Sequence, residues 1–306
     1  MKVLTHEQLA EFLPVLEKDF PRSLPVYHVM RNVVRQRFAW PGIEFIVDDF
    51  PNPSVCIARP RKDDKSFVPL MNGYQVFVYS KDTNVFRKML FEEPDTLDWT
   101  QNIMFADLSE PEHLVLLEGG KGFRGGTFDH LITMEGFPTG EYCYYFDLPN
   151  LDLQYEVPEG LRLGTLNPEH AVQVARERNY GHTANNIAFF RYMMENEYPS
   201  AALFPVGSDS PIAYAIYKTE GVVGAAFIHP DYRKRGLYQV VLRALLKKLR
   251  DIGEIHVWVE TMKFNLASQA GIKAVGAKEY EGHTVHWINY WPAGHAFDRD
   301  PYKNFR

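Results

Sequence analysis

The sequence predicts an α/β protein, in the broad sense that includes α+β folds, built as two globular domains. Helical and strand-like patterns alternate through both halves of the chain, which favours sheets covered by helices over an all-helical or an all-strand fold. The 306 residues are about twice the usual size of one domain. A break rich in Pro and Gly at residues 147–160 separates the halves, so we expect domains at residues 1–150 and 151–306.

The first half begins with a helix whose start is marked by Thr5 and Gln8, the pattern of a capping box. A second helix begins at Pro25, because proline is favoured in the first turn of a helix. Strands are predicted where β-branched and aromatic residues cluster, and short helices where apolar residues recur every three or four positions. The predicted strands are 43–47, 54–58, 74–79 and 141–146, and the short helices are 83–90 and 111–118.

The second half repeats the alternation of helices and strands. Its strongest helix covers residues 237–250, where apolar residues form one face and Lys247, Lys248 and Arg250 suit the negative end of the helix dipole. The other predicted helices are 168–178, 185–196 and 264–270, and the predicted strands are 161–166, 201–206, 212–217, 222–228, 255–259 and 284–290.

The charge of the chain excludes some partners. The net charge of −6 argues against general affinity for nucleic acid or for an anionic membrane. No window of 18 uninterrupted apolar residues is present, so we expect no membrane span. Residues 1–150 carry 15 basic and 22 acidic side chains, whereas residues 151–306 carry 18 and 17. An anionic ligand is therefore expected in the second half.

The cysteine and histidine content predicts neither disulfides nor a metal site. Cys56 and Cys143 lie far apart, without a CxxC motif or a neighbouring group of histidines. The N-terminal residues have neither the apolar core of a secretory signal nor an Arg-rich, acid-poor transit pattern. We therefore expect an intracellular protein with reduced thiols.

The segment 222–239 carries the chemistry. An apolar strand is followed by a short basic loop with a glycine, and the loop leads directly into the strong helix. The first N–H groups of a helix lack internal partners and attract phosphate, and Gly236 allows close approach of the backbone. Neither GxGxxG nor GxxxxGK[ST] is present, which disfavours a Rossmann or P-loop nucleotide site. The segment predicts a pyrophosphate site formed by Arg233, Lys234, Arg235, Gly236, Leu237 and Tyr238.

This segment resembles the signature of the GNAT superfamily of acyltransferases, which is Arg or Gln, two residues, Gly, one residue, then Gly or Ala. Here the signature is Arg233-x-x-Gly236-x-Tyr238, with a bulky residue in the last position. Asn265 and Ser268 follow the next strand and resemble the second signature, in which an Asn near a helix start faces the pantetheine arm. The resemblance implies that these residues bind acyl-CoA as a co-substrate, with no permanently bound cofactor.

Further blocks are similar to the animal glycine N-acyltransferase family. They lie in the same order along nearly the whole chain, at residues 23–27, 47–51, 74–82 and 229–233. The resemblance implies two tandem GNAT-like domains with mixed, mostly antiparallel sheets, the second of which binds CoA. It also implies transfer of an acyl group from acyl-CoA to glycine or another small amino acid. Relatives of this type are mitochondrial as a family, and the cytoplasm is the alternative.

The reaction assigns roles to further residues. Pantetheine carries amides and can pair with a strand edge, for which we expect Ala226, Phe227 and Ile228. A backbone N–H near Phe227 would stabilise the oxyanion of the thioester carbonyl. The ammonium of the acceptor must also lose a proton before it can attack.

The general base is the point where the family pattern fails. The Glu expected from the family falls on Val222, which cannot accept a proton. Glu220, two residues earlier, and His286, on the last predicted strand, are the candidates for the catalytic base. His229 and a positioned water are alternatives. Lys273 stands where many GNAT enzymes keep a tyrosine that protonates the thiolate.

Two alternative functions follow from these departures. A protein that binds acyl-CoA or a protein partner without catalysis would keep the pyrophosphate site but not the base. An acetyltransferase that acts on a protein or polyamine would suit the acidic first half of the chain.

Overall fold

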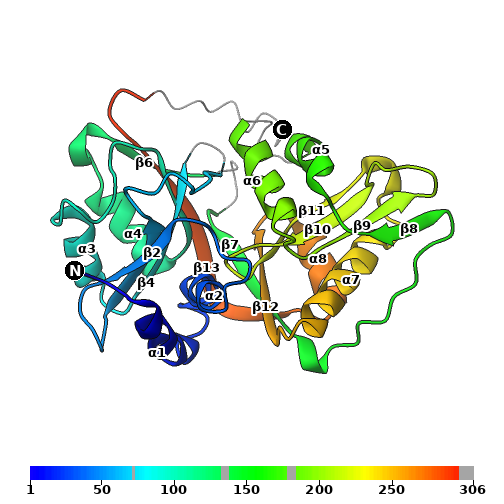
Figure 1. The fold of residues 1–306 in the computed structure, drawn as a ribbon, viewed down its shortest axis with the longest axis horizontal. Coiled ribbons are helices and arrows are strands. Elements are labelled where there is room, and N and C mark those ends of the chain that lie inside the picture. The colour runs from blue at the N-terminus through cyan, green and yellow to red at the C-terminus, as the bar shows by residue number, and fades with distance from the viewer. Residues whose placement is uncertain (71–72, 132–137, 178–183, 296–306) are drawn as a thin grey trace. The chain divides into compact units, whose positions relative to one another are not determined.

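The computed structural model describes residues 1–70, 73–131, 138–177 and 184–295 (Figure 1). They form two compact units. Among these residues, unit 1 comprises Met1–Glu141 and 282–295, and unit 2 comprises Tyr142–Glu281. The expected division at residue 150 differs from this one, because the chain leaves unit 1 nine residues earlier and returns to it with the last strand.

The sheet of unit 1 has the strand order β1-β2-β3-β4-β5-β13, and β6 also pairs with β13. β4 and β5 are parallel and are connected through helix α3, whereas the other registered pairs are antiparallel. The strands are β1 (Lys2–Val3), β2 (Ile43–Val47), β3 (Val55–Pro60), β4 (Tyr74–Ser80), β5 (Ile103–Ser109), β6 (Thr127–His130) and β13 (Lys278–Trp291).

The helices of unit 1 begin where the sequence supplies caps. Thr5 and Gln8 form the predicted capping box at the start of α1, and Asp82 accepts the N–H groups of Asn84 and Val85 at the start of α3. Proline occupies the first turn of both α2 and α4. The helices are α1 (His6–Glu17), α2 (Leu24–Val34), α3 (Thr83–Phe91) and α4 (Glu110–Gly119), with a short 3-10 turn at η1 (Phe123–Gly125).

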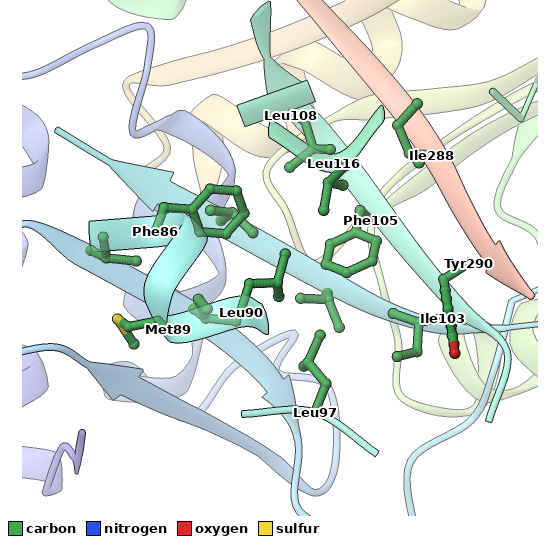
Figure 2. Packing of buried hydrophobic residues seen from close by; sticks show 14 of the residues in the cluster. Phe86, Met89, Leu90, Leu97, Ile103, Phe105, Leu108, Leu116, Ile288 and Tyr290 are labelled. Atoms are coloured by element: carbon green, nitrogen blue, oxygen red, sulfur yellow. The ribbon is translucent and has the colours of Figure 1, made fainter. Parts of the chain in front are cut away.

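One hydrophobic core holds unit 1 together and includes residues from the end of the chain. Helix α3 contributes Phe86 and Leu90, and these pack in a cluster with Phe105 of β5 (Figure 2). Ile288 and Tyr290 of β13 belong to the same cluster and are almost completely buried. The burial of these side chains explains why the last strand belongs with unit 1.

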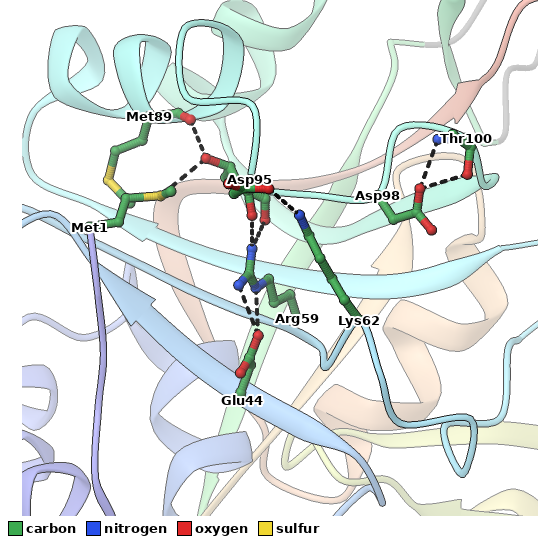
Figure 3. Close-up of polar contacts among 9 residues, drawn as sticks. Met1, Glu44, Arg59, Lys62, Met89, Asp95, Asp98 and Thr100 are labelled. Atoms are coloured by element: carbon green, nitrogen blue, oxygen red, sulfur yellow. Dashed lines mark hydrogen bonds and ion pairs between the residues drawn. The ribbon is translucent and has the colours of Figure 1, made fainter.

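A polar network ties the segment after α3 to the sheet (Figure 3). The guanidinium of Arg59 on β3 forms an ion pair with Glu44 on β2, with an N–O distance of 2.9 Å, and donates to the backbone carbonyls of Asp95 and Thr96. Lys62 lies 2.8 Å from the carboxylate of Asp95. Because Arg59 is only 8% exposed, these acceptors are what make its burial tolerable.

Unit 2 contains an antiparallel sheet with the strand order β11-β10-β9-β8. Two further strands follow the order β13-β7-β12. The strands are β7 (Glu141–Asp147), β8 (Leu161–Gly164), β9 (Ser200–Pro205), β10 (Ala213–Tyr217), β11 (Val223–Ile228) and β12 (His256–Met262), and a 3-10 turn, η2 (Leu148–Asn150), follows β7.

The helices of unit 2 follow the sequence prediction with small shifts. The predicted helix at 168–178 starts as the 3-10 turn η3 (Pro168–His170) and continues as α5 (Ala171–Glu177), and residue 178 lies outside the described residues. The last helix begins two residues later than predicted, because Asn265 caps it. The remaining elements are α6 (Ala184–Glu195), η4 (Pro230–Tyr232), α7 (Leu237–Asp251) and α8 (Leu266–Ala274).

Candidate functional site

Strand β11 carries a β-bulge. Tyr214 of β10 pairs with Phe227, and Ile216 pairs with Gly224, so β11 has one residue more than β10 over this stretch. Ala225, inside the bulge, has a φ of 52°, a conformation that residues with a Cβ rarely adopt. A bulge bends its strand and changes the direction of the backbone groups that follow it. The end of β11 therefore departs from a regular antiparallel ladder.

The other side of β11 is an open edge. β11 is the last strand of its sheet, and a single parallel bridge between Val222 and Trp258 joins its start to β12. Among the residues that the structure describes, no further pair links β11 to β12. The backbone groups of residues 224–228 that point away from β10 therefore have no strand partner.

The hydrogen-bond register identifies which of these groups point to the open edge. The N–H of His229 donates to the carbonyl of Ile212 at 2.7 Å. Because such bonds alternate every two residues in an antiparallel ladder, the N–H of Phe227 also faces β10, and that of Ile228 faces the open edge. The N–H group near Phe227 that faces the open edge is therefore that of Ile228.

The loop after β11 presents a row of backbone donors. Lys234 and Gly236 have φ values of 62° and 74°, and Gly236 immediately precedes α7. In this described segment, the N–H groups of residues 234–238 have no acceptor. Five consecutive donors at a helix start, where the dipole is positive, form a site for an anion.

Each of the two arginines of the loop makes one hydrogen bond to the backbone and keeps its other N–H donors available. Arg233 donates from Nε to the carbonyl of Ile228 at 3.2 Å, which ties the loop to the end of β11. Arg235 donates to the carbonyl of Asp231 at 3.0 Å, and its guanidinium lies 5.1 Å from the ring centre of Tyr232. Both side chains are exposed, and an Arg has five donors, so most of them can reach an anion.

The bulky residue of the signature points away from the loop. A Cβ added to Gly271 of α8 would lie 2.6 Å from the ring of Tyr238. The hydroxyl of Tyr238 bonds to Ser268, and burial raises the pKa of Tyr238 to about 12. Tyr238 therefore joins α7 to α8, and its side chain leaves the row of donors uncovered.

Asn265 and Ser268 have structural roles at the start of α8. The side-chain oxygen of Asn265 accepts from the N–H of Ser268 at 3.1 Å and caps the helix. The Ser268 hydroxyl forms a hydrogen bond with the hydroxyl of Tyr238. Through these contacts unit 2 brings both residues together with the start of α7, and a role for Asn265 in binding pantetheine stays a prediction.

Glu220 lies in the turn before β11 and is buried rather than solvated. Its carboxylate lies 2.5 Å from Lys218 Nζ, and the same ammonium lies 3.7 Å from Glu260 on β12. Glu220 is only 1% exposed. Val222, at the position of the family Glu, is completely buried in the bridge to β12.

His286 belongs to unit 1 and lies on β13, so it is not among the residues that unit 2 brings together. Its Nε2 lies 2.6 Å from the carboxylate of Glu110 at the start of α4. Its ring stacks on His113 with a centroid distance of 3.9 Å. Its role as a base stays a prediction.

Sequence reasoning missed a cavity of about 560 Å³ in unit 2. Gln173 and Glu177 of α5 line it, together with His229 and Tyr232, which directly precede the basic loop in the chain. Glu177 also accepts a hydrogen bond from the hydroxyl of Tyr214 at 3.0 Å. The lining residues come from three separate segments, 169–177, 210–212 and 229–232, so no local pattern could indicate the cavity.

Two family models match the chain. Residues 1–115 match the model described as aralkyl acyl-CoA:amino acid N-acyltransferase, and residues 180–276 match the acetyltransferase (GNAT) family. The second match contains the bulged strand, the basic loop and α7. No curated protein sequence matches the chain.

Solved structures resemble the chain over most of its length at low sequence identity. A Drosophila protein has a TM-score of 0.74 and 16% identity, over 95% of this chain and 98% of that one. A tandem GNAT protein from the clavulanic acid biosynthesis pathway has a TM-score of 0.56 and 13% identity, over 96% and 98%. A GCN5-related N-acetyltransferase from Sphaerobacter thermophilus has a TM-score of 0.51 and 11% identity, over 86% and 85%.

These findings confirm the predicted fold, an α/β chain of two tandem GNAT-like domains with mostly antiparallel sheets. The fold, the loop and the family matches together support an acyl-CoA-dependent N-acyltransferase of the GNAT type, with acyl-CoA as co-substrate. Within that class, the match over residues 1–115 confirms the resemblance to the glycine N-acyltransferase family. Among the described residues, no helix is long and apolar enough to cross a membrane.

Proposed function

We propose that this chain transfers an acyl group from acyl-CoA to the amine of glycine or another small amino acid. The proposal rests on one observation in unit 2. Two neighbouring sets of backbone groups lack hydrogen-bond partners. The five free N–H groups of residues 234–238 follow directly after the open edge of β11, which ends at Ile228. A ligand with a diphosphate and an extended chain of amides matches both surfaces.

The diphosphate of CoA would be held by the loop. Free amides at the start of α7 donate to its oxygens, and the exposed guanidinium groups of Arg233 and Arg235 add charge-assisted hydrogen bonds. Lys234 adds a further positive charge.

The pantetheine arm would extend along β11. Its amides pair with backbone groups of a strand edge as an added strand does. Ala226 is exposed and small, so the arm can approach the backbone there. The thioester carbonyl then lies near the N–H of Ile228, which faces the same edge and stabilises the oxyanion.

Acyl transfer proceeds by addition and elimination at the thioester carbon. A base takes one proton from the ammonium of the acceptor, and the neutral nitrogen attacks the carbonyl carbon. The C–N bond forms, the C–S bond breaks, and the CoA sulfur leaves as a thiolate that takes up the second proton lost by nitrogen. Glu220 is the base that unit 2 offers. Because its carboxylate is buried beside Lys218, the proton reaches it through a water molecule.

The proposal is tested by crossing short, long and aromatic acyl-CoAs with glycine, other small amino acids, polyamines and lysine peptides, and measuring release of free thiol. We expect release with a small amino acid and an amide product of matching mass. Release only with polyamines or peptides would contradict the proposed acceptor. The double variant R233A/R235A should weaken CoA binding, which removes the thermal stabilisation by CoA of about 2.7 kcal/mol expected at 100 times the dissociation constant.

A second candidate function is acyl-CoA binding without catalysis. It is favoured by one observation, the burial of Val222 where the family has its Glu. This function predicts the same stabilisation by CoA but no thiol release with any acceptor. Absence of both stabilisation and thiol release would contradict the two candidates together.

A further inference from the structure

Three histidines that are distant in the sequence meet in unit 1. His113 lies one turn into α4, His130 is the last residue of β6, and His286 lies on β13. One ring nitrogen of each lies within 4.8 Å of the others. His113 and His286 are 5% and 2% exposed, and His130 is half-buried.

The sheet register brings these side chains together. His130 pairs with Ile288 across β6 and β13, so His286, two residues away, lies on the same face as its diagonal neighbour. On its other side β13 pairs with β5, which contains a bulge at Asp107 with a φ of 55°. Helix α4 starts directly after β5, and its first turn therefore passes over His286.

A carboxylate lies beside the cluster. Glu110 Oε2 lies 2.6 Å from His286 Nε2, and Oε1 lies 3.8 Å from His113 Nδ1. The side chain of Glu110 is 57% exposed, so it connects the buried rings to the solvent. It offers an oxygen donor and also an entry route for an ion.

One distance in the cluster is already that of a metal centre. His113 Nε2 and His130 Nε2 are 3.3 Å apart. Two ligands at 2.0–2.1 Å from a tetrahedral zinc ion are also about 3.3 Å apart. Three imidazoles with one carboxylate suit Zn²⁺ and its neighbours in the first transition row, whereas Ca²⁺ and Mg²⁺ prefer oxygen ligands throughout.

We propose that His113, His130, His286 and Glu110 form a binding site for a zinc-class divalent cation in unit 1. The ion would fasten α4 and β6 to β13. The rings of His113 and His286 are parallel within 4°, so their in-plane lone pairs do not converge, and one ring turns about its Cβ–Cγ bond when the ion binds. None of these residues belongs to the loop and strand edge proposed for acyl-CoA, and all four lie in unit 1.

The test is calorimetric titration of the chelator-treated full chain with zinc chloride, together with the visible spectrum after addition of Co²⁺. We expect one ion per chain and the strong absorption of tetrahedral cobalt. His130→Ala and His286→Gln should each weaken binding by about 100-fold or more, because loss of a ligand costs at least as much as loss of its outer partner. His283→Gln is the matched control, a half-buried histidine on the same strand outside the cluster, and should bind like the parent chain.

No heat of binding with zinc, or equal affinity of His130→Ala and the parent chain, would overturn the site. His130 is half-buried and lies at a strand end, so its variant is the one expected to fold in every case. Circular dichroism of each variant verifies this before titration. The weak absorption of octahedral cobalt would overturn the proposed four-ligand, tetrahedral site.

Discussion

The ring of Tyr238 occupies the space that a side chain on residue 271 would need. A Cβ on Gly271 would lie 2.6 Å from Cδ1 and 2.7 Å from Cε1 of Tyr238. The two residues thus set the approach of α7 to α8, and they explain how a signature that usually ends in a small residue accommodates a tyrosine. The last position of the signature affects helix packing here, and the N–H groups of the loop are unaffected.

This contact predicts a change of sign in a double-mutant cycle. Gly271→Ala should destabilise the chain by about 1–3 kcal/mol, the usual cost of overpacking. In the background of Tyr238→Ala, the same substitution should instead stabilise it by about 0.5–1 kcal/mol, because alanine is the better helix former. Urea unfolding of the four proteins measures both values. Equal effects in the two backgrounds would contradict the contact.

Gly236 gives a second prediction with an internal control. A Cβ at Gly236 would meet only Gln239, at 3.9 Å, and one at Gly253 would meet nothing within 4 Å, yet both glycines have a left-handed φ, 74° and 87°. Valine at either position should cost about 1–2 kcal/mol of stability through φ alone. Only Gly236→Val should abolish thermal stabilisation by CoA, since Gly253 lies beyond the far end of α7. If Gly253→Val also abolished it, the effect would come from helix stability and not from the loop.

The sequence predicts well those elements whose cause is local. The capping box of Thr5 and Gln8 and the apolar face of α7 involve residues within one or two turns of each other, and both are confirmed. The same is true of the basic loop, because the strand, the glycine and the helix that form it are contiguous. Their physical causes act over a few residues and are visible in any short window.

Elements defined by the tertiary fold were missed or shortened. Strand β5 is buried on both faces and includes Met104, Ala106 and Asp107, so neither alternation nor β-propensity marks it. β13 was predicted as 284–290 but covers Lys278–Trp291, and its second part belongs to unit 1. The histidine cluster joins three elements, and His130 and His286 are 156 positions apart, so no sequence spacing could indicate it.

If Glu220 is the general base, its substitution should reduce catalysis without affecting the binding of CoA. Glu220→Gln should lower kcat by at least about 100-fold, the usual contribution of a general base, and should leave stabilisation by CoA intact. Glu260→Gln, which changes the more distant carboxylate at 3.7 Å from the same lysine, should retain most of the activity. Steady-state thiol release and CoA-dependent melting give the two readouts.

Lys218→Met tests the same ion pair through stability. The substitution removes the ammonium 2.5 Å from Glu220 and leaves that carboxylate buried without its nearest opposite charge. Urea unfolding at neutral pH should show a loss of about 3–5 kcal/mol, the usual cost of breaking a buried ion pair. Unchanged stability would contradict a buried charge pair, and retained activity in Glu220→Gln would show that the base lies elsewhere.

His283 predicts how the stability of unit 1 depends on acid. Burial, with smaller contributions from the charges of Arg22 and His286, lowers the pKa of His283 from 6.5 to about 4. Between about pH 6.5 and pH 4, His283 therefore binds a proton in the unfolded chain but not in the folded chain. The free energy of unfolding falls as pH decreases through this window. His283→Asn removes this titration, so its stability should fall less steeply than that of the parent chain. Urea unfolding of both proteins with a chelator present, from neutral pH to about pH 4.5, measures the difference. If the free energies of unfolding of the variant and the parent chain fell equally with pH, the acid sensitivity would come from other groups.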